Sequence, residues 1–430
     1  MDRPRRATGR RPARHTSVRA VSPTADDLLT GELRALLAFA AGARHPDGGF
    51  GHLAADGSLL ADQPRATYGT ARMTHVFSLA AMLGSPGADE LAAHGVAALT
   101  GPFRDAEHGG WVASLGPAGD GADDTKAAYV HAFVVLAGAS AATAGVPGGR
   151  ALLDEALAVW DRHFWDDAAG MAVEEWDAGW RTCADYRGIN ANMHGVEAVL
   201  AAADALEVLG EGAPGQLRSR VVRVVERVVH GWARERDWRL PEHFDASWQV
   251  LTEYNADRPS DPFRPYGVTV GHQLEWSRLA LHTRAVLGDD APGWLLPDAV
   301  GLYRAAVDRG WAVDGHDGFV YTLDWADRPV VTARMHWVLA EAIGAAAVLG
   351  AVTGDPGYAQ DLERWEQHAT DRFRDPVHGG WHHELTPEGD VGTTTWTGKP
   401  DAYHVAQALL LPRIPVRGSI AAGVRAALRG

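Results

Sequence analysis

The stretch HGGWHHELTPEGD at residues 378–390 decides the fold, because the chain carries the same motif earlier as HGGWVASLGPAGD at residues 108–120. Both copies share His-Gly-Gly-Trp, a leucine four residues after the tryptophan, and a closing Pro-x-Gly-Asp. Glycine permits tight turns, and alternating residues after it favour a short β-hairpin. We therefore interpret the motif as a structural unit that the chain repeats.

Weaker copies of the Gly-aromatic core recur along the chain. The aromatic residue, or a methionine in one copy, stands at positions 50, 111, 171, 319 and 381, so consecutive copies lie 61, 60, 148 and 62 residues apart. The long interval corresponds to about two periods and predicts a degenerate copy. We assign that copy to LPEHFDASWQVL at residues 240–251, which gives six units in total.

The segments between the motifs show the 3.6-residue periodicity of amphipathic helices, and two helices fit into each period. Six helix pairs with one hairpin each favour a closed ring over an open solenoid, because solenoid repeats are usually shorter. We predict an all-α fold, an (α/α)6 barrel of about twelve helices with short β-hairpins at one mouth. Examples of the helical segments are 26–43, 87–103, 151–165, 215–233 and 361–373.

Within the 430 residues we expect one barrel domain over residues 24–415 and a C-terminal extension over residues 416–430. The Arg-rich residues 1–22 lack the apolar core of a signal peptide and are expected to be a disordered tail. The apolar stretch 342–352 is too short to cross a bilayer and predicts a buried helix, so no membrane partner is expected.

Charge and cysteine content restrict the function further. The net charge of -15 disfavours a nucleic-acid partner, which would need a basic face. The single cysteine, Cys183, excludes an internal disulfide and fits a reducing compartment, so we expect a cytoplasmic location. The sequence leaves a homo-oligomer possible.

Each unit continues into a helix that carries a histidine in its first turns. In a barrel these inner helices aim their N-terminal ends at one mouth, where the helix dipoles suit electron-rich ligands. We expect His75 and His131, which have bulky apolar neighbours, to be structural. The residues expected around the shared cavity are His194, His272, His336, His404, Arg72, Lys126, Asn190, Arg334 and Asp401.

Two histidines are followed by a glutamate at the i,i+3 spacing of one helix face, His194 with Glu197 and His272 with Glu275. A glutamate so placed can orient an imidazole and raise its basicity, so we expect Glu275 to tune His272. A metal site is the alternative, because both residue types are ligands. The scattered acidic residues do not suggest a carboxylate cage, so we expect neither a metal nor another cofactor.

The tryptophans suggest a sugar ligand. Trp325 and Trp396 lie in or beside the hairpins, where an aromatic ring could stack on the apolar face of a sugar. Trp111 and Trp381 repeat from copy to copy and are expected to pack one hairpin against the next. The chain has no phosphate-binding glycine loop and no GxSxG motif, so nucleotide-dependent and serine-hydrolase activities have no support.

Several segments together resemble the N-acylglucosamine 2-epimerase superfamily, and most closely its aldose–ketose isomerase branch of D-mannose and sulfoquinovose isomerases. The resemblance runs from about residue 30 to 416 and implies an (α/α)6 barrel with metal-free chemistry on an unmodified monosaccharide. Its motifs are RMTHVFSLA, YRGINANMHGVEAVL, EHFDASWQ, FRPYGVTVGHQLEWSRL and GKPDAYHVAQALLLPRIP.

The resemblance also implies roles for individual residues. It makes His272 and His404 the acid/base pair, with Glu275 beside them, and places Arg72 against substrate oxygens near the reacting carbons. The further residues that it places at the pocket are Tyr129, Asn190, His194, Trp337 and Glu341.

These roles agree with the chemistry of an aldose–ketose isomerisation, which moves a proton between C2 and C1 through a cis-enediol. An imidazole with a pKa near 6.5 can take and return that proton at neutral pH, and a guanidinium can stabilise the enediolate oxygens. We expect His404 to carry the C2/C1 proton and His272 to act at the ring oxygen or O1, although the reverse assignment remains open.

The first-choice reaction is D-mannose to D-fructose, with D-lyxose to D-xylulose as a side reaction. Alternatives are mannose/glucose 2-epimerisation, sulfoquinovose isomerisation, hydrolysis by an inverting glycoside hydrolase of the same fold, and sugar binding without catalysis. Pro400 and the pair His382–His383 depart from the sulfoquinovose type and disfavour an organosulfonate. Because the sixth hairpin leads to the helix of His404, we expect His383 at the pocket rim and Asp401 at the substrate.

Overall fold

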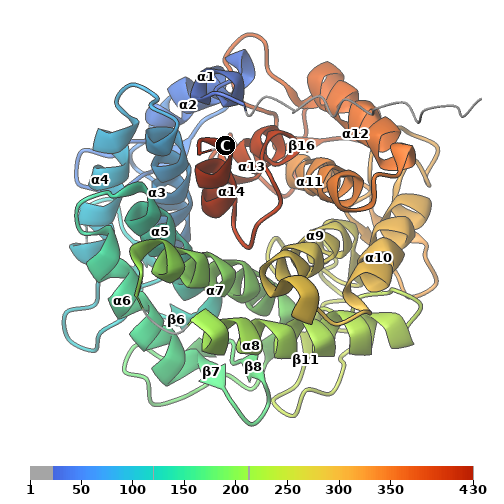
Figure 1. Cartoon of the computed structure of the whole chain (residues 1–430), viewed down its shortest axis with the longest axis horizontal. Helices are drawn as coiled ribbons and strands as arrows, with labels where there is room; N and C mark the ends of the chain where they lie inside the picture. The colour runs from blue at the N-terminus through green and yellow to red at the C-terminus, as the bar shows by residue number, and fades with distance from the viewer. Residues whose placement is uncertain (1–22, 120, 212–213, 430) are drawn as a thin grey trace, which may run out of the picture.

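The computed structural model describes residues 23–119, 121–211 and 214–429, and the predicted tail at residues 1–22 lies outside this part of the chain. Within the described ranges the chain forms fourteen α-helices and sixteen short strands. Twelve of the helices, α2 to α13, make two concentric rings (Figure 1). The outer ring consists of α2 (Gly31–Ala41), α4 (Ala88–Thr100), α6 (Gly149–Val159), α8 (Pro214–Val225), α10 (Leu295–Gly310) and α12 (Pro356–His368).

The inner ring alternates with the outer one along the chain. Each inner helix packs against the next, and α13 contacts α3 and so closes the ring. This arrangement confirms the prediction of an all-α (α/α)6 barrel. The inner helices are α3 (Thr67–Met82), α5 (Ala128–Ala144), α7 (Ile189–Leu209), α9 (Val270–Leu287), α11 (His336–Thr353) and α13 (Tyr403–Leu410).

The helix boundaries differ from the predicted segments in two ways. The segment 26–43 is split into α1 (Ala25–Leu28) and α2, because the side chain of Thr30 accepts a hydrogen bond from the Leu33 amide and caps α2. Three outer helices continue into π-helical turns, at Trp160–Phe164, Glu226–Ala233 and Ala369–Phe373. Short 3-10 turns lie at Gly288–Asp290 and Leu411–Arg413.

The inner helices are buried on almost all sides, and most of the residues around their circumference are apolar apart from the buried polar groups near the cavity. Among the described residues, α11 alone is long and apolar enough, by length and composition, to cross a membrane. Its window is 67% buried, because the helix stands between α9 and α13 in the inner ring.

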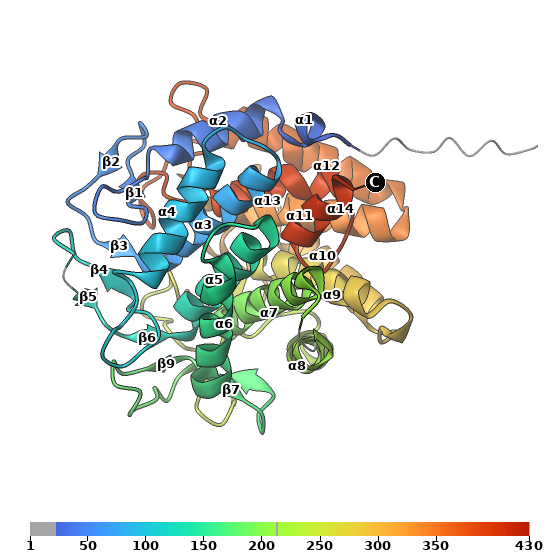
Figure 2. The same cartoon turned by 60° about the vertical axis from the view of Figure 1, so that its left-hand side comes forward.

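Short antiparallel strands join neighbouring units at the N-terminal ends of the inner helices. Strands β1 to β6 and β9 lie together on the left of Figure 2. The strands are β1 (His52–Leu53), β2 (Leu59–Leu60), β3 (Arg65–Ala66), β4 (Ser114–Leu115), β5 (Gly121–Asp123), β6 (Lys126–Ala127), β7 (Trp165–Asp166), β8 (Met171–Ala172), β9 (Glu175–Trp176), β10 (Arg187–Gly188), β11 (His243–Phe244), β12 (Val268–Thr269), β13 (Thr322–Leu323), β14 (Pro329–Val331), β15 (Arg334–Met335) and β16 (Glu384–Leu385).

We call β3, β6, β10, β12 and β15 the lead-in strands, because each runs directly into an inner helix. Each lead-in strand pairs with the hairpin of the next unit, in the pairs β3–β4, β6–β9, β10–β11, β12–β13 and β15–β16. Strand β11 belongs to the segment 240–251, so the degenerate copy does form a hairpin unit. The last unit meets the first where the Lys399 amide donates to the Leu53 carbonyl over 2.9 Å.

The two tryptophans that the motif repeats are buried and structural, but their indoles bond to outer helices, whereas they were expected to pack one hairpin against the next. Trp111 is fully buried, and its Nε1 donates to the Leu99 carbonyl over 2.7 Å. Trp381 is buried in the same way, and its Nε1 donates to the carboxylate of Glu32 over 2.8 Å. Each indole therefore ties a hairpin to an outer helix.

Two basic residues that were expected at the cavity point elsewhere. Nζ of Lys126 lies 2.6 Å from Oδ2 of Asp105, and Nη2 of Arg334 lies 2.6 Å from Oδ1 of Asp314. Both bases stand on lead-in strands just before the helix starts, and both reach back into hairpin loops. Their positive charge holds the loops in place and does not serve the cavity.

The described part of the predicted extension, residues 416–429, packs on the barrel. It contains α14 (Ile420–Ala427), which packs against α3, α5, α7 and α13 and lies at the end of the ring away from the hairpins (Figures 1 and 2). At its start, Oγ of Ser419 donates to Oδ2 of Asp204 over 2.9 Å.

The buried pair Lys126–Asp105 gives a test of this architecture. Replacing Lys126 with methionine leaves the partly buried carboxylate without its cation, so the free energy of unfolding should fall by about 3 kcal/mol. Urea denaturation followed by tryptophan fluorescence measures this change. The double variant K126M/D105N should recover part of the loss, and an unchanged K126M midpoint would show that the pair does not stabilise the fold.

Candidate active site

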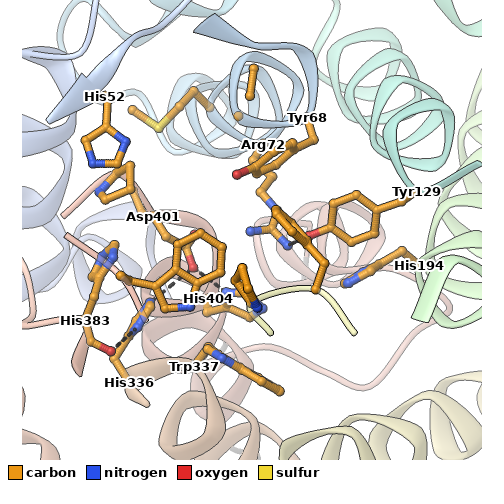
Figure 3. Close-up of a pocket in the computed structure, with 18 of the residues that line it drawn as sticks. His52, Tyr68, Arg72, Tyr129, His194, His336, Trp337, His383, Asp401 and His404 are labelled. Atoms are coloured by element: carbon orange, nitrogen blue, oxygen red, sulfur yellow. Dashed lines mark hydrogen bonds and ion pairs between the residues drawn. The ribbon is translucent and has the colours of Figure 1, made fainter. Parts of the chain in front are cut away.

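The N-terminal ends of the inner helices surround a cavity of about 190 Å³ (Figure 3). His194, His272, His336 and His404 all line it, so four of the six aligned histidines share one space. Figure 3 shows His383 and His336 on one side of the cavity and Tyr129 and His194 on the other. The further predicted residues along its wall are Arg72, Tyr129, Asn190, Glu275, Trp337, His383 and Asp401.

The remaining two histidines belong to the fold, as predicted. Nδ1 of His75 lies 2.6 Å from Oγ of Ser140. His131 lies between the Ala127 carbonyl, 2.8 Å from Nδ1, and the Trp111 amide, which is 3.2 Å from Nε2. Burial lowers the pKa of His75 to about 4 and that of His131 to about 3, so both rings are neutral at pH 7.

The carboxylate of Asp401 joins two of the cavity histidines. Its Oδ2 forms a hydrogen bond with Nδ1 of His404 and lies 3.1 Å from Nε2 of His336. Although burial disfavours a charged carboxylate, the neighbouring imidazoles hold the pKa of Asp401 well below its usual range. Burial lowers the pKa of His404 despite the opposing attraction of Asp401, so His404 is a neutral base at pH 7.

His272 is held in the same way, but by Glu242, which was not among the predicted site residues. Its Nδ1 lies 3.0 Å from both carboxylate oxygens of Glu242, which stands at the hairpin of the degenerate unit. The expected tuning of His272 by Glu275 is therefore wrong. One turn along α9, Glu275 instead lies 3.7 Å from Nδ1 of His194 and 3.5 Å from Nη2 of Arg278.

Both acid/base candidates thus bind a buried carboxylate through Nδ1. No described residue forms a hydrogen bond with Nε2 of His272 or His404, and both rings line the cavity. The indole of Trp337 lies between them, with its ring centroid 5.3 Å from His272 and 5.9 Å from His404. Gly271 makes this possible, because a Cβ there would lie 2.2 Å from the indole.

Arg72 brings a positive charge to the cavity wall. Its Nη2 donates to the hydroxyl of Tyr129 over 2.9 Å, and its guanidinium lies 4.3 Å from the ring centroid of Phe133 and 4.8 Å from that of Tyr403. In the described part of the chain no carboxylate pairs with it within 4.0 Å. A guanidinium surrounded by rings and without a carboxylate in direct contact is suited to an electron-rich ligand.

Glu275 is the acidic residue on the cavity floor. Burial, together with the nearby Glu341, raises its pKa well above the usual range, and its Oε1 is buried without a hydrogen bond to any described residue. A protonated carboxyl group in this position can donate to a ligand oxygen. Asn190 has a similar unbonded Oδ1, which is available to a ligand hydroxyl.

Glu341 was predicted to bind substrate, but it does not line the cavity. Its carboxylate lies 2.9 Å from Nε of Arg278, and both residues are buried beneath the floor. Glu197 lies beside them, where it accepts from the hydroxyl of Tyr403 and lies 3.5 Å from Nδ1 of His194. These residues support the floor from below.

The outer wall contains residues that the sequence analysis missed or misplaced. His383 is 6% exposed and stacks on His336 with ring centroids 4.0 Å apart, so it lies in the wall and not at the rim. Trp396 lines the cavity as a sugar platform would, whereas the indole of Trp325 bonds to the Thr252 carbonyl outside it. Missed lining residues include His52, Tyr68, Phe263 and Tyr321.

Three groups of side chains have the composition of a metal site. They are His336–Asp401–His404, His194–Glu197–Glu275 and Glu275–Glu341–His404, in each of which the candidate ligand atoms lie within 4.8 Å of one another. Most of these carboxylates already bind an imidazole, a phenol or a guanidinium. This donor pattern suits a hydrogen-bonded acid/base site better than a cation cage.

Comparison with known proteins places the chain in a family. The family model for N-acylglucosamine 2-epimerase (GlcNAc 2-epimerase) matches residues 48–408. A D-mannose isomerase from Thermobifida fusca is 52% identical over 91% of this chain and 95% of its own length. One from Pseudomonas cannabina pv. alisalensis is 44% identical over 94% of this chain and 96% of its own.

A solved structure of similar shape supports the same relationship. The crystal structure of a D-mannose isomerase superposes with a TM-score of 0.80 at 26% identity, and the match covers 88% of this chain and 95% of that one. Since the family model spans most of the barrel and both relatives cover nearly the whole chain, the chain belongs to the N-acylglucosamine 2-epimerase family.

Proposed function

We propose that this protein interconverts D-mannose and D-fructose by moving a proton between C2 and C1 of the open-chain sugar. The observation that carries the proposal is the pair His272 and His404, which line one cavity and each bind a buried carboxylate through Nδ1. The relatives that share 52% and 44% of their residues with this chain are named D-mannose isomerase, which supports the same substrate here.

In the proposed reaction, neutral His404 takes the C2 proton through Nε2, and the electron pair of that bond forms the C1–C2 double bond. His272 begins this step as the imidazolium and donates its Nε2 proton to O1, which gives a cis-enediol. His272 then removes the proton from O2, and His404 returns its proton to C1, so the ketose forms and both rings regain their starting state. A carboxylate that fixes Nδ1–H keeps Nε2 available for these transfers.

The remaining polar groups stabilise the negative charge that develops on the sugar oxygens during this transfer. Arg72 is the cation suited to the enediolate oxygens, because no carboxylate of the described chain neutralises it. Glu275, with its raised pKa, supplies a hydrogen-bond donor from the floor. His383 forms part of the wall beside His336 and contributes to the choice of sugar.

The acid/base pair is tested by replacing each histidine with alanine. H404A and H272A should each lower kcat for D-mannose by at least about a thousandfold, because general acid–base catalysis supplies up to four orders of magnitude. Ketose formation measured by NMR reports activity, and circular dichroism reports folding. Activity near that of the wild type in either folded variant would contradict the assignment.

Incubation in D2O distinguishes the related reactions. D-mannose, D-glucose, sulfoquinovose and a disaccharide are each offered to the wild-type protein. Fructose is the expected product from mannose, and deuterium at its C1 would show that the proton on His404 exchanges with solvent before it is returned. Glucose with deuterium at C2 would indicate a 2-epimerase instead, and cleavage of the disaccharide would indicate a glycosidase.

Glu242 should act by positioning His272. Replacing it with glutamine keeps the shape but turns an acceptor into a possible donor at Nδ1, so kcat should fall by roughly tenfold to a hundredfold with little change in KM. Asp245→Asn is the matched control, because Asp245 accepts amide hydrogen bonds in the same hairpin at 2.8 and 2.9 Å. If E242Q and D245N lowered kcat equally, Glu242 would only stabilise the hairpin and would not position His272.

The proposed chemistry uses no metal ion. Prolonged dialysis against EDTA should therefore leave kcat and KM for D-mannose unchanged, with the metal content followed by elemental analysis. Loss of activity that a divalent cation restores would overturn this part of the proposal and point to one of the carboxylate–imidazole groups on the cavity floor.

A further inference from the structure

The sixth hairpin motif holds a buried carboxylate that the proposed chemistry does not use. Glu384 stands on β16, directly after His383, and is 2% exposed. The second copy of the motif has Ser114 in its place. A buried carboxylate needs partners, so the groups that satisfy Glu384 indicate what it is for.

Among the described residues, all side-chain hydrogen bonds of Glu384 go to one segment of the chain. Oε1 accepts from the Thr394 amide over 2.9 Å and also from the Thr394 hydroxyl, while Oε2 accepts from the amides of Thr395 and Trp396 over 2.7 and 3.1 Å. Four donors match the roughly four lone-pair positions of a carboxylate. Glu384 therefore gathers three consecutive backbone amides around one side chain.

This segment, residues 391–399, is called the Trp396 loop below. Its far end is fixed to the first unit, because Nε2 of His52 lies 2.8 Å from the Thr397 carbonyl and the Lys399 amide donates to the Leu53 carbonyl. At Gly398 the backbone has a φ of +70°, and a Cβ would lie 2.2 Å from the Leu53 carbonyl oxygen. Glu384 thus anchors the part of the loop that precedes this fixed end.

The anchored loop presents Trp396 to the cavity. The indole lines the cavity and meets the ring of Phe263 edge-on, with centroids 5.6 Å apart. Trp396 and Phe263 are more exposed than the two acid/base histidines, of which His404 is 5% and His272 is 7% exposed. A sugar with C1 and C2 between the histidines therefore directs its remote carbons toward Trp396.

We propose that Glu384 is a positioning residue that fixes Trp396 against the end of the sugar remote from C1 and so sets the preference for a hexose over a pentose. The inference rests on the proposed function. D-Mannose and D-lyxose have the same configuration at C2, C3 and C4, and lyxose lacks only the C6 hydroxymethyl group. The ratio of kcat/KM for the two sugars therefore reports contacts made to C6.

The test replaces Glu384 with glutamine. An amide offers one acceptor oxygen and turns an NH2 group toward backbone donors, so the loop loses part of its anchor. The mannose/lyxose ratio of kcat/KM should fall by roughly tenfold, through a higher KM for mannose, because a buried methylene-sized contact is worth at least that factor. Hydrogen–deuterium exchange of the sugar-free protein should become faster across residues 394–396.

Asp324→Asn is the matched control. Asp324 accepts from the amides of Ala326 and Arg328 over 2.8 and 2.9 Å in the hairpin of the fifth unit, and that hairpin loop does not line the cavity. The mannose/lyxose ratio of kcat/KM for D324N should equal that of the wild type. Trp396→Leu should reproduce the ratio of E384Q, and the double variant should lower it no further, because both changes remove one contact.

The outcomes separate the two proposals. If the wild type does not convert mannose, the proposed function fails, and the exchange measurement still decides whether Glu384 anchors the loop. An unchanged ratio in an active E384Q variant overturns the inference, and so does unchanged exchange. If E384Q does not fold, Thr394→Val removes one donor and should shift both measurements in the same direction; a wild-type result there overturns the inference.

Discussion

The pairing of each lead-in strand with the hairpin of the next unit is the constraint on which the rest of the structure depends. A lead-in strand ends where an inner helix begins, so the pairing fixes where the first turn of that helix lies. Arg72, His194 and His272 stand in the first two turns of helices that follow a lead-in strand, and His404 stands at the start of α13, whose approach is fixed by the hydrogen bond from the Lys399 amide to the Leu53 carbonyl. The contacts that close the ring therefore also set the distances across the cavity, and catalytic geometry follows from architecture.

Buried charge is distributed in two tiers around this ring. At the mouth, Lys126 and Arg334 are paired with aspartates of the hairpin loops and keep those loops in place. Closer to the cavity, Asp401 and Glu242 bind the Nδ1 atoms of His404 and His272, so two residues from distant parts of the chain are held through the same ring nitrogen. Arg72 alone among these charged groups has no charged partner, and it faces the cavity.

The ring and most of the cavity-lining residues could be predicted from the sequence, because both follow from the repeat. Histidines in register on repeated helices must meet at one mouth, and four of the six do so. Glu242 could not be found in this way, since it lies in the copy that lost the Gly-aromatic signal and reaches His272 through strand pairing. Nearness in sequence favoured Glu275, but three residues along a helix is nearly one turn deeper, where Arg278 and His194 surround it.

Helix α14 makes the two ends of the inner ring different. It lies across the end of the inner ring away from the hairpins, held by Ser419 against Asp204. Trp396 and Phe263 are cavity-lining residues on the more exposed side, so we expect sugars to enter and leave past these two rings. Substrate and product would then share one route, so the product must leave before the next sugar can bind.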